Sequence, residues 1–161
     1  MAIDDVRING LQISKASAIL KLDDEQVHGW VSCKYADGSE TAYAYGAGRH
    51  QGPRGRTAGK YTPEPVAIVF HKSTAKALRQ RLAAKSVSGR SFGTVTFNGS
   101  LQYVEPDDDT VTVLFEGLRL TKISSSDEDS ADASSDECEF SVMRIKRDGL
   151  VLYDDRAGAG V

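Results

Sequence analysis

A glycine- and arginine-rich stretch over 46–62 holds the residue types that could bind phosphate. Gly46–Gly48 begins the spacing of a dinucleotide-binding loop, but such a loop needs a third glycine where Gln51 stands. The run Gly55–Lys60 is one residue shorter than a phosphate-cradling loop, and it is followed by Tyr61 instead of a hydroxyl that could ligate magnesium. Neither nucleotide-binding motif is complete.

The same stretch could contact nucleic acid directly, because Arg49, Arg54 and Arg56 can pair with backbone phosphates. Aromatic residues that would stack on bases are not interleaved with these arginines, which weakens that interpretation. The plain alternative is an exposed basic loop whose glycines adopt positive φ, which explains the residue types but not the length. A nucleic-acid-binding β-barrel stays open as a secondary interpretation.

Catalytic and metal-binding patterns are weak throughout the chain. The histidines His28, His50 and His71 are scattered, and none has a cysteine at metal-ligand spacing. The run Asp107–Asp109 resembles half of a calcium loop, but the glycine and the later glutamate are missing. No nucleophile has a base at a recognisable spacing. We therefore expect no enzyme, no catalytic residue, no metal and no cofactor.

Charge is divided into two blocks, although the net charge is only -3. Residues 46–104 include ten basic residues and one acid, whereas residues 105–139 include twelve acids and two basic residues. Two interpretations stay open. Either the fold mixes the two blocks, or oppositely charged surfaces of separate copies associate head to tail into rings or filaments.

Length and composition indicate a single domain over residues 1–161, with 40% hydrophobic residues to build a core. No apolar run approaches the roughly 18–20 residues that would span a bilayer. The first five residues lack the basic and apolar regions of a signal peptide. We expect a soluble protein made in the cytoplasm, with no membrane partner.

Alternation of apolar and polar residues with a period of two predicts a mainly β fold, an antiparallel β-sandwich or barrel. Polar turns are expected between the strands, the strongest at Asp148-Gly149, and others at 23–26, 37–38 and 106–109. The expected strands are 17–22, 27–35, 40–45, 66–70, 94–105, 110–121, 139–147 and 150–154.

One segment, 73–85, predicts a flanking helix. Ser73 is a plausible N-cap, and Ala75, Leu78 and Leu82 are spaced to form one apolar stripe against a sheet, with the arginines facing outward.

Two segments are predicted to be irregular. The long loop over 46–62 exceeds an ordinary hairpin loop, and loops of that length in compact domains are usually functional or disordered. The acidic loop over 124–138 contains a Ser/Asp/Glu tract up to Glu137 with no aromatic or β-branched residue, so we expect it not to pack.

The residues Ala44–Arg49, followed by Pro53–Tyr61, resemble the "YG-G-R…P-GRT-G-Y-P" signature of bacteriophage tail tube proteins. Three further segments are similar to the N-terminal strand, the post-helix strand and the C-terminal hairpin of that family, namely 5–10, 91–97 and 145–153. The resemblance covers most of the chain in order and spacing. The acidic tract over 124–139 does not match the pattern.

The tail tube resemblance implies a β-sandwich or barrel subunit with one flanking helix. Six subunits would close into a ring whose inner strands line a channel, and stacked rings would form the tube for tape-measure protein and then DNA. The implied partners also include tail sheath, tail terminator and baseplate hub. The implied location is the virion tail, assembled in the host cytoplasm. A tube subunit of a phage-related injection or secretion apparatus has the same architecture and stays open as an alternative.

Under this resemblance the long loop reaches a neighbouring subunit or ring. We expect the interface to hold Arg49, Arg54, Arg56, Lys60 and Tyr61, with the cations meeting carboxylates of the adjacent copy. Exposed ion pairs contribute only ~0–1 kcal/mol each, so several must act together. The channel wall is expected to present acidic or neutral side chains, because bound phosphate would retard DNA.

The two cysteines are most simply free thiols in a protein made in the cytoplasm. Cys33 shares a predicted strand face with Val31 and Tyr35, so we expect apolar surroundings. Cys138 ends the acidic tract, where we expect solvent and another chain to reach it and carboxylates to raise its pKa. The hypothesis is that Cys138 forms an inter-chain disulfide in the mature tail, to a neighbouring tube subunit or to a sheath, with Cys33 less suited.

Overall fold

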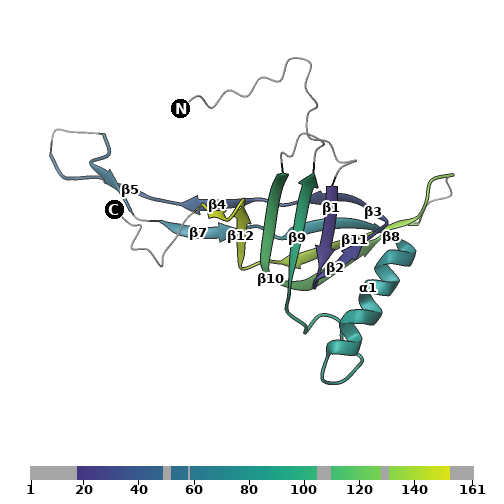
Figure 1. Ribbon diagram of the computed structural model, residues 1–161. Helices are drawn as coiled ribbons and strands as arrows, with labels where there is room; N and C mark the ends of the chain where they lie inside the picture. Colours follow the sequence, from purple (N-terminus) through teal and green to yellow (C-terminus); the bar gives the residue numbers. More distant parts are fainter. Residues whose placement is uncertain (1–17, 49–51, 58, 105–109, 128–130, 153–161) are drawn as a thin grey trace, which may run out of the picture.

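A computed structural model describes residues 18–48, 52–57, 59–104, 110–127 and 131–152 (Figure 1). Its single described helix is α1 (Lys72–Lys85). The strands are β1 (Ala18–Leu22), β2 (Glu25–Val27), β3 (Trp30–Lys34), β4 (Asp37–Glu40), β5 (Tyr43–Ala44), β6 (Gly55–Arg56), β7 (Lys60–Pro63), β8 (Val66–His71), β9 (Phe97–Val104), β10 (Thr110–Ser125), β11 (Ser135–Ser141), β12 (Arg144–Arg147) and β13 (Leu150–Val151).

The long strand β10 belongs to two sheets. Sheet 1 has the order β2-β1-β9-β10-β12-β13, and every neighbouring pair is antiparallel. Sheet 2 has the order β10-β11-β8-β3 and is also antiparallel. The strand changes sheet at a bulge between Phe115 and Leu118, where Gly117 has a φ of 72°. Bulges of this kind bend a strand, so the two sheets fold over each other.

The core lies between the two sheets, as the predicted sandwich requires. Strand β8 alternates strictly, with Val66, Ile68 and Phe70 buried and the residues between them partly exposed. Phe97 of sheet 1 meets Phe140 of sheet 2 edge to face, with ring centroids 5.8 Å apart. Each fully buried apolar side chain contributes about 1.5–3 kcal/mol, so this layer supplies most of the stabilisation. The prediction of a mainly antiparallel β-sandwich with one flanking helix is confirmed.

The helix α1 closes the end of the sandwich beside β8, β11 and the β1–β2 hairpin (Figure 1). The predicted stripe is confirmed, since Ala75, Leu78 and Leu82 are buried. The predicted cap is wrong. The N-cap residue is His71, which makes no side-chain capping hydrogen bond, and Ser73 lies inside the first turn.

Several local strand and turn predictions are confirmed. The strand at 18–22, the central strand β8 and the β9–β10 pairing appear as expected, while the turn between β9 and β10 lies in residues 105–109, outside the described part of the chain. Asp148 and Gly149 form the β12–β13 hairpin with φ values of 54° and 78°, as expected for a tight turn with two left-handed residues.

Two predicted strands are each divided in the structure. The segment 27–35 breaks after Val27, because Gly29 has a φ of 77° and β3 joins a different sheet from β2. Thr74 lies so close to Gly29 that an added Cβ would overlap its hydroxyl. The segment 139–147 breaks between β11 and β12, so its first half joins sheet 2 and its second half joins sheet 1.

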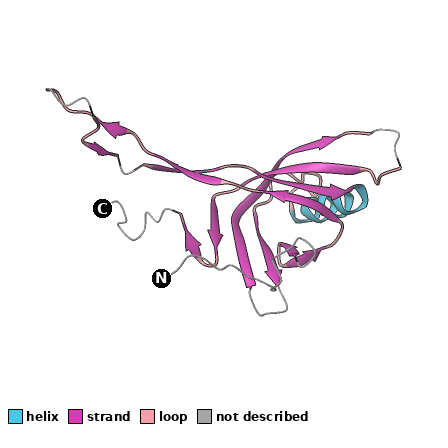
Figure 2. Cartoon of the chain, turned by 90° about the horizontal axis from the view of Figure 1, so that it is seen from above, coloured by secondary structure: helices cyan, strands magenta, loops and turns pink. Residues whose placement is uncertain are grey.

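The long loop is a β-arm, which corrects the prediction of an irregular segment over 46–62. Strand β4 pairs with β7 and β5 pairs with β6, so the described residues of 37–48, 52–57 and 59–63 form a ribbon that projects from the sandwich (Figures 1 and 2). Asp37 and Gly38, predicted as a turn, begin its first strand. The pairing satisfies backbone groups that an irregular loop of this length would leave to solvent.

The acidic tract is also partly ordered, which corrects the expectation that it cannot pack. Strand β10 continues to Ser125 and β11 begins at Ser135, and both run in sheet 2. Asp136 and Cys138 alternate into the interior, so the tract contributes a buried face. Figure 2 shows this end of sheet 2 and the β-arm at opposite ends of the molecule.

Candidate assembly surfaces

The root of the β-arm is held to sheet 1 by Tyr61. Its hydroxyl donates to Asp37 Oδ2 at 2.9 Å and accepts from the Ile145 backbone N–H at 3.0 Å. Arg147 Nη1 lies 2.6 Å from Asp37 Oδ1, and the Asp37 side chain is only 2% exposed. Burial raises the pKa of Tyr61, with the Asp37 hydrogen bond and charge acting in the same direction. Tyr61 was predicted at a subunit interface, and the structure places it at the arm's own attachment point.

The basic residues of the arm have different surroundings. Arg54 folds back over Gly46, where an added Cβ would lie 2.6 Å from Arg54 Nε, and its Nη2 donates to the Ala47 carbonyl at 3.3 Å. Arg54 therefore braces the tip internally. Arg56 and Lys60 are exposed and form no ion pair with a described residue, although Glu40 is the register partner of Lys60. Arg49 lies outside the described residues.

Two tyrosines accompany these cations. Tyr43 and Tyr45 are 62% and 66% exposed, and Tyr43 is the register partner of Arg56. The sequence order suggested that no aromatic residue is interleaved with the arginines, but strand pairing places one directly opposite. The arm therefore presents aromatic area together with positive charge, a combination that is enriched in protein interfaces.

The fold mixes the two charge blocks at α1, as the first of the two charge interpretations expected. Lys72 lies 2.6 Å from Asp127, and Arg79 lies 3.4 Å from Asp136, so basic-block residues pair with acidic-block residues. Arg81 also pairs with Glu25 at the other side of the helix. Because these side chains are already paired within the chain, much of the charge of α1 is not available for ion pairs with another copy.

Both cysteines are free thiols that face the interior. Cys33 and Cys138 are each register partners of Ile68, so they lie in one row on either side of β8. Two strand spacings are about 9.6 Å, too far for a disulfide within the chain. Burial raises the pKa of Cys33 to about 12 and that of Cys138, with further help from Asp136, to about 11.

The expectation of an exposed Cys138 is wrong, since only 1% of this residue is exposed. Period-two alternation directs its side chain inward, while its neighbours Glu137 and Glu139 point outward. The inter-chain disulfide stays an untested prediction, and it lacks the accessible thiol on which it was based.

The outer face of sheet 1 carries neutral polar, charged and some apolar side chains. Strand register places Lys21, Ser100, Leu114 and Lys146 in one row across β1, β9, β10 and β12. Lys146 is paired with Glu116 at 2.8 Å. The helix leaves this face open, because α1 packs on sheet 2 and on the opposite side of the β1–β2 hairpin (Figure 1).

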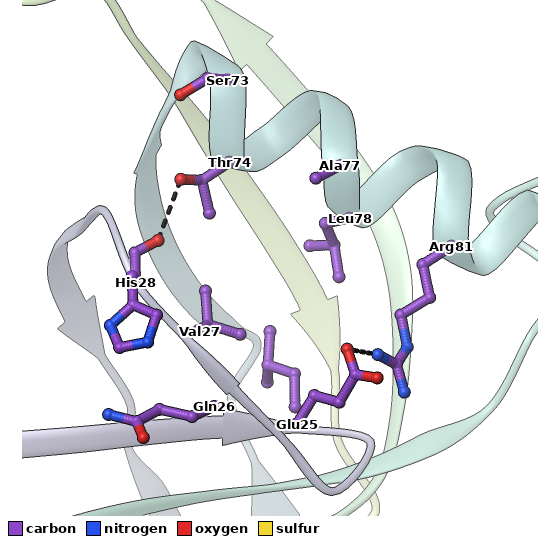
Figure 3. Close-up of a pocket in the computed structure, with 10 residues that line it drawn as sticks. Glu25, Gln26, Val27, His28, Ser73, Thr74, Ala77, Leu78 and Arg81 are labelled. Carbon is purple, nitrogen blue, oxygen red and sulfur yellow. Dashed lines mark hydrogen bonds and ion pairs between the residues drawn. The ribbon is translucent and has the colours of Figure 1, made fainter.

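A groove of about 320 Å³ lies between α1 and the β1–β2 hairpin (Figure 3). Its apolar lining comes from Leu22, Val27, Ala77 and Leu78, and the ion pair between Arg81 and Glu25 crosses one end.

At the other end of the groove, the Thr74 hydroxyl donates to the His28 carbonyl at 2.9 Å (Figure 3). This hydrogen bond uses the backbone of His28 and brings no nucleophile to its imidazole. The arrangement suits an apolar side chain better than it suits catalysis. Sequence spacing could not reveal the groove, because its two walls are separated by some fifty residues of chain and meet only when α1 docks.

No group of three or more His, Cys, Asp or Glu among the described residues could hold a metal ion. Among the described segments, no helix is both long and apolar enough to cross a bilayer.

Solved structures share this fold of two antiparallel sheets with one flanking helix. A tube terminating cap of the anti-feeding prophage has a TM-score of 0.60 at 15% identity, over 91% of this chain and 98% of the other. A PVC sheath-tube complex, from an extracellular contractile injection system, has a TM-score of 0.56 at 12% identity, over 86% and 93%. Hcp1 from Flavobacterium johnsoniae has 0.54 at 13%, over 85% and 98%.

No protein-family model and no curated protein sequence matches the chain. At these identities the likeness establishes the fold.

Proposed function

We propose that the chain is a structural subunit of a bacteriophage tail tube, in which rings of six copies stack into a channel for DNA delivery. The observation that carries the proposal is a sandwich with a projecting β-arm whose likeness to a tube terminating cap covers 91% of this chain. Tape-measure protein would occupy the channel first, and DNA would pass through it at ejection. The protein would assemble in the host cytoplasm and reside in the virion.

The outer face of sheet 1 is the part that we assign to the channel wall. It is free of the helix and consists largely of neutral side chains such as Ser100, Gln102 and Thr112. Its charged side chains are Lys21, Arg144, Lys146 and Glu116, so it carries more cations than acids, unlike the acidic or neutral wall expected from the sequence. Lys146 pairs with Glu116, and the neutral majority of the face would limit how strongly passing phosphates bind.

The β-arm is the part that we assign to contacts between copies, in the same or the next ring. Arg56 and Lys60 are exposed without an ion-pair partner in the described residues, and Tyr43 offers apolar area beside them. Carboxylates of another copy would form ion pairs with these cations. Sheath, terminator and baseplate hub are further partners in this proposal.

A tube subunit of a phage-related injection apparatus is the second candidate. It is favoured by the similar structures, which come from an anti-feeding prophage, an extracellular contractile injection system and a type six secretion system. The two candidates differ in cargo. Particles purified with the subunit would contain packaged genomic DNA only if the first candidate is right.

Electron microscopy of the purified full chain tests the shared part of both candidates. We expect rings or filaments with a central channel. The double variant Arg56→Glu/Lys60→Glu should abolish stacking, because it places like charges at the proposed contact, while circular dichroism stays unchanged. Lys76→Glu/Arg90→Glu, which makes the same change of charge at exposed sites off the arm, should still assemble. A monomer that binds single-stranded DNA and never assembles would instead support the β-barrel alternative.

A further inference from the structure

We propose that neighbouring copies in a ring join edge to edge, with β13 of one copy lying along β2 of the next and Leu150 inserted into the groove between α1 and β2. The inference rests on the proposed ring assembly and names the surfaces that close it. Its occupant is a second copy of this chain. Strand direction, side-chain orientation and groove chemistry support it separately.

The number of strands in sheet 1 makes its two edges complementary. In the described part of the chain, sheet 1 has six strands that alternate strictly in direction from β2 to β13, so its two edge strands run in opposite directions. Copies related by rotation about an axis parallel to the strands would therefore meet with β13 antiparallel to the neighbour's β2. An odd number of strands would have brought parallel edges together. Sheet 1 can continue across the contact with the pattern that it already has.

The exposed side chain at the β13 edge points toward the core side of sheet 1. Leu150 is the register partner of Arg147. Arg147 lies on the core side, where it pairs with buried Asp37 and stands 5.5 Å above the Tyr35 ring. Partners across an antiparallel pair share a face, so Leu150 lies on that side too. It is nevertheless 74% exposed, because no further strand or helix among the described residues covers it.

The groove lies on the core side of the opposite edge. Val27 is the register partner of Leu20, which is fully buried in the core, so Val27 also points inward. Beyond β2 the groove continues onto Ala77 and Leu78 of α1 (Figure 3). If a strand is added beside β2 and its residue on the core side is a leucine, the leucine side chain would lie in this groove. The two edges are thus matched in direction, in face and in apolar character.

Both edge strands are short, at three and two residues, and each has one strand partner among the described residues. An edge strand of this kind presents backbone donors and acceptors to another chain. A heterologous contact of this kind would pair them in every copy of a closed ring. Ring closure then removes all the free edges of sheet 1 at once.

Cysteine cross-linking tests the contact in the assembled protein. The variant Ala77→Cys/Leu150→Cys, oxidised after assembly, should give a ladder of covalent oligomers on a non-reducing gel, ending at the number of copies in one ring. Cys33 and Cys138 give no background, because both are turned inward and have strongly raised pKa values. The matched control is Val87→Cys/Leu150→Cys, whose first thiol is fully exposed beyond the end of α1 and outside the groove.

The outcomes separate this inference from the proposed function. Rings with no ladder, or an equal ladder from the control pair, would overturn the edge-to-edge contact and leave the tube proposal intact. A wild-type chain that stays monomeric would overturn both.

A second variant, Leu150→Glu, should form no rings even when its protein concentration is more than tenfold above the concentration at which the wild type forms them. Its thermal unfolding should match the wild type, since the side chain is mostly exposed in the isolated subunit. Val87→Glu, an equivalent change at another exposed apolar residue, should assemble normally. Normal assembly of Leu150→Glu would contradict the inference.

Discussion

At the scale of single residues, the most consequential side chains are polar groups buried at junctions. Tyr61 and Asp37 tie the root of the β-arm to β12, and Asp136 ties α1 to β11. In each case removing one partner leaves another buried polar group unsatisfied, which costs about 1–3 kcal/mol. The orientation of the arm and the seating of the helix therefore depend on a few hydrogen bonds.

Tyr61→Phe should loosen the arm without unfolding the sandwich. The change removes a donor to Asp37 and an acceptor for the Ile145 N–H, so we expect a loss of about 1–2 kcal/mol in the free energy of unfolding. Hydrogen exchange should accelerate in β4 and β7. Tyr43→Phe, at an exposed tyrosine of the same arm, should leave both measurements unchanged. Equal exchange in the two variants would contradict this role of Tyr61.

Asp136 should make stability depend on pH. A hydrogen bond from Ser125, followed by the Lys72 and Arg79 charges, holds the pKa of Asp136 below its ordinary value of 3.8. Its contribution is therefore complete above that value and is lost as the pH falls below it. Asp136→Asn should lower the urea midpoint at pH 7, and the difference from wild type should shrink near pH 3. Glu137→Gln, at the exposed neighbouring carboxylate, should show no such convergence.

At the scale of elements, the bend in β10 and the β-arm determine the shape of the subunit. The bend allows one strand to serve both sheets, and Gly117 stands at that point with a positive φ and Met143 against it. The arm is a two-stranded ribbon, which is marginally stable alone and depends on its anchored root.

Gly117→Ala should destabilise the protein by more than the backbone penalty alone. A left-handed conformation costs a non-glycine residue roughly 1–2 kcal/mol, and here the new Cβ would also meet Met143 at 2.6 Å. Gly89→Ala isolates the backbone term, because Gly89 has a similar φ of 68° and open space around it. Thermal unfolding should show a larger decrease for Gly117→Ala, and equal decreases would mean that Met143 adapts freely.

At the scale of the whole molecule, two kinds of surface are available for assembly. The arm carries exposed cations and tyrosines. The edges of sheet 1, within the described residues, carry exposed Leu150 on β13 and the apolar groove beside β2. The basic block over 46–104 and the acidic block over 105–139 have less charge available for contacts between copies than the sequence suggests, because α1 residues of the first block pair with carboxylates of the second within one chain.

Salt should therefore separate two steps of assembly. At about 1 M salt the screening length is ~3 Å, so contacts between arm cations and carboxylates weaken while apolar burial and backbone pairing persist. We expect isolated rings in high salt and stacked rings in low salt, distinguished by sedimentation velocity and electron microscopy. Loss of rings and stacks at the same salt concentration would indicate that one charged surface forms both contacts.

Local patterns in the sequence determined much of the fold. Alternation predicted β1, β8 and the β9–β10 pair, the Asp148-Gly149 turn predicted the last hairpin, and the 3.6-residue spacing predicted the stripe of α1. These features depend on residues a few positions apart, whose conformational preferences act without the rest of the molecule. The resemblance to tail tube proteins also followed from local segments in order.

Only the tertiary structure decided which strands pair and which polar residues are buried. The glycines and arginines of 46–62 suggest a loop, and only the pairing of β7 with β4 and of β6 with β5 shows that part of this segment is a two-stranded ribbon. Cys138 sits between two glutamates in the sequence, yet pairing of β11 with β8 and β10 directs it into the core. The groove forms only when α1 meets the β1–β2 hairpin. Such contacts join residues far apart in the chain, and burial is a property of those contacts rather than of neighbouring residue types.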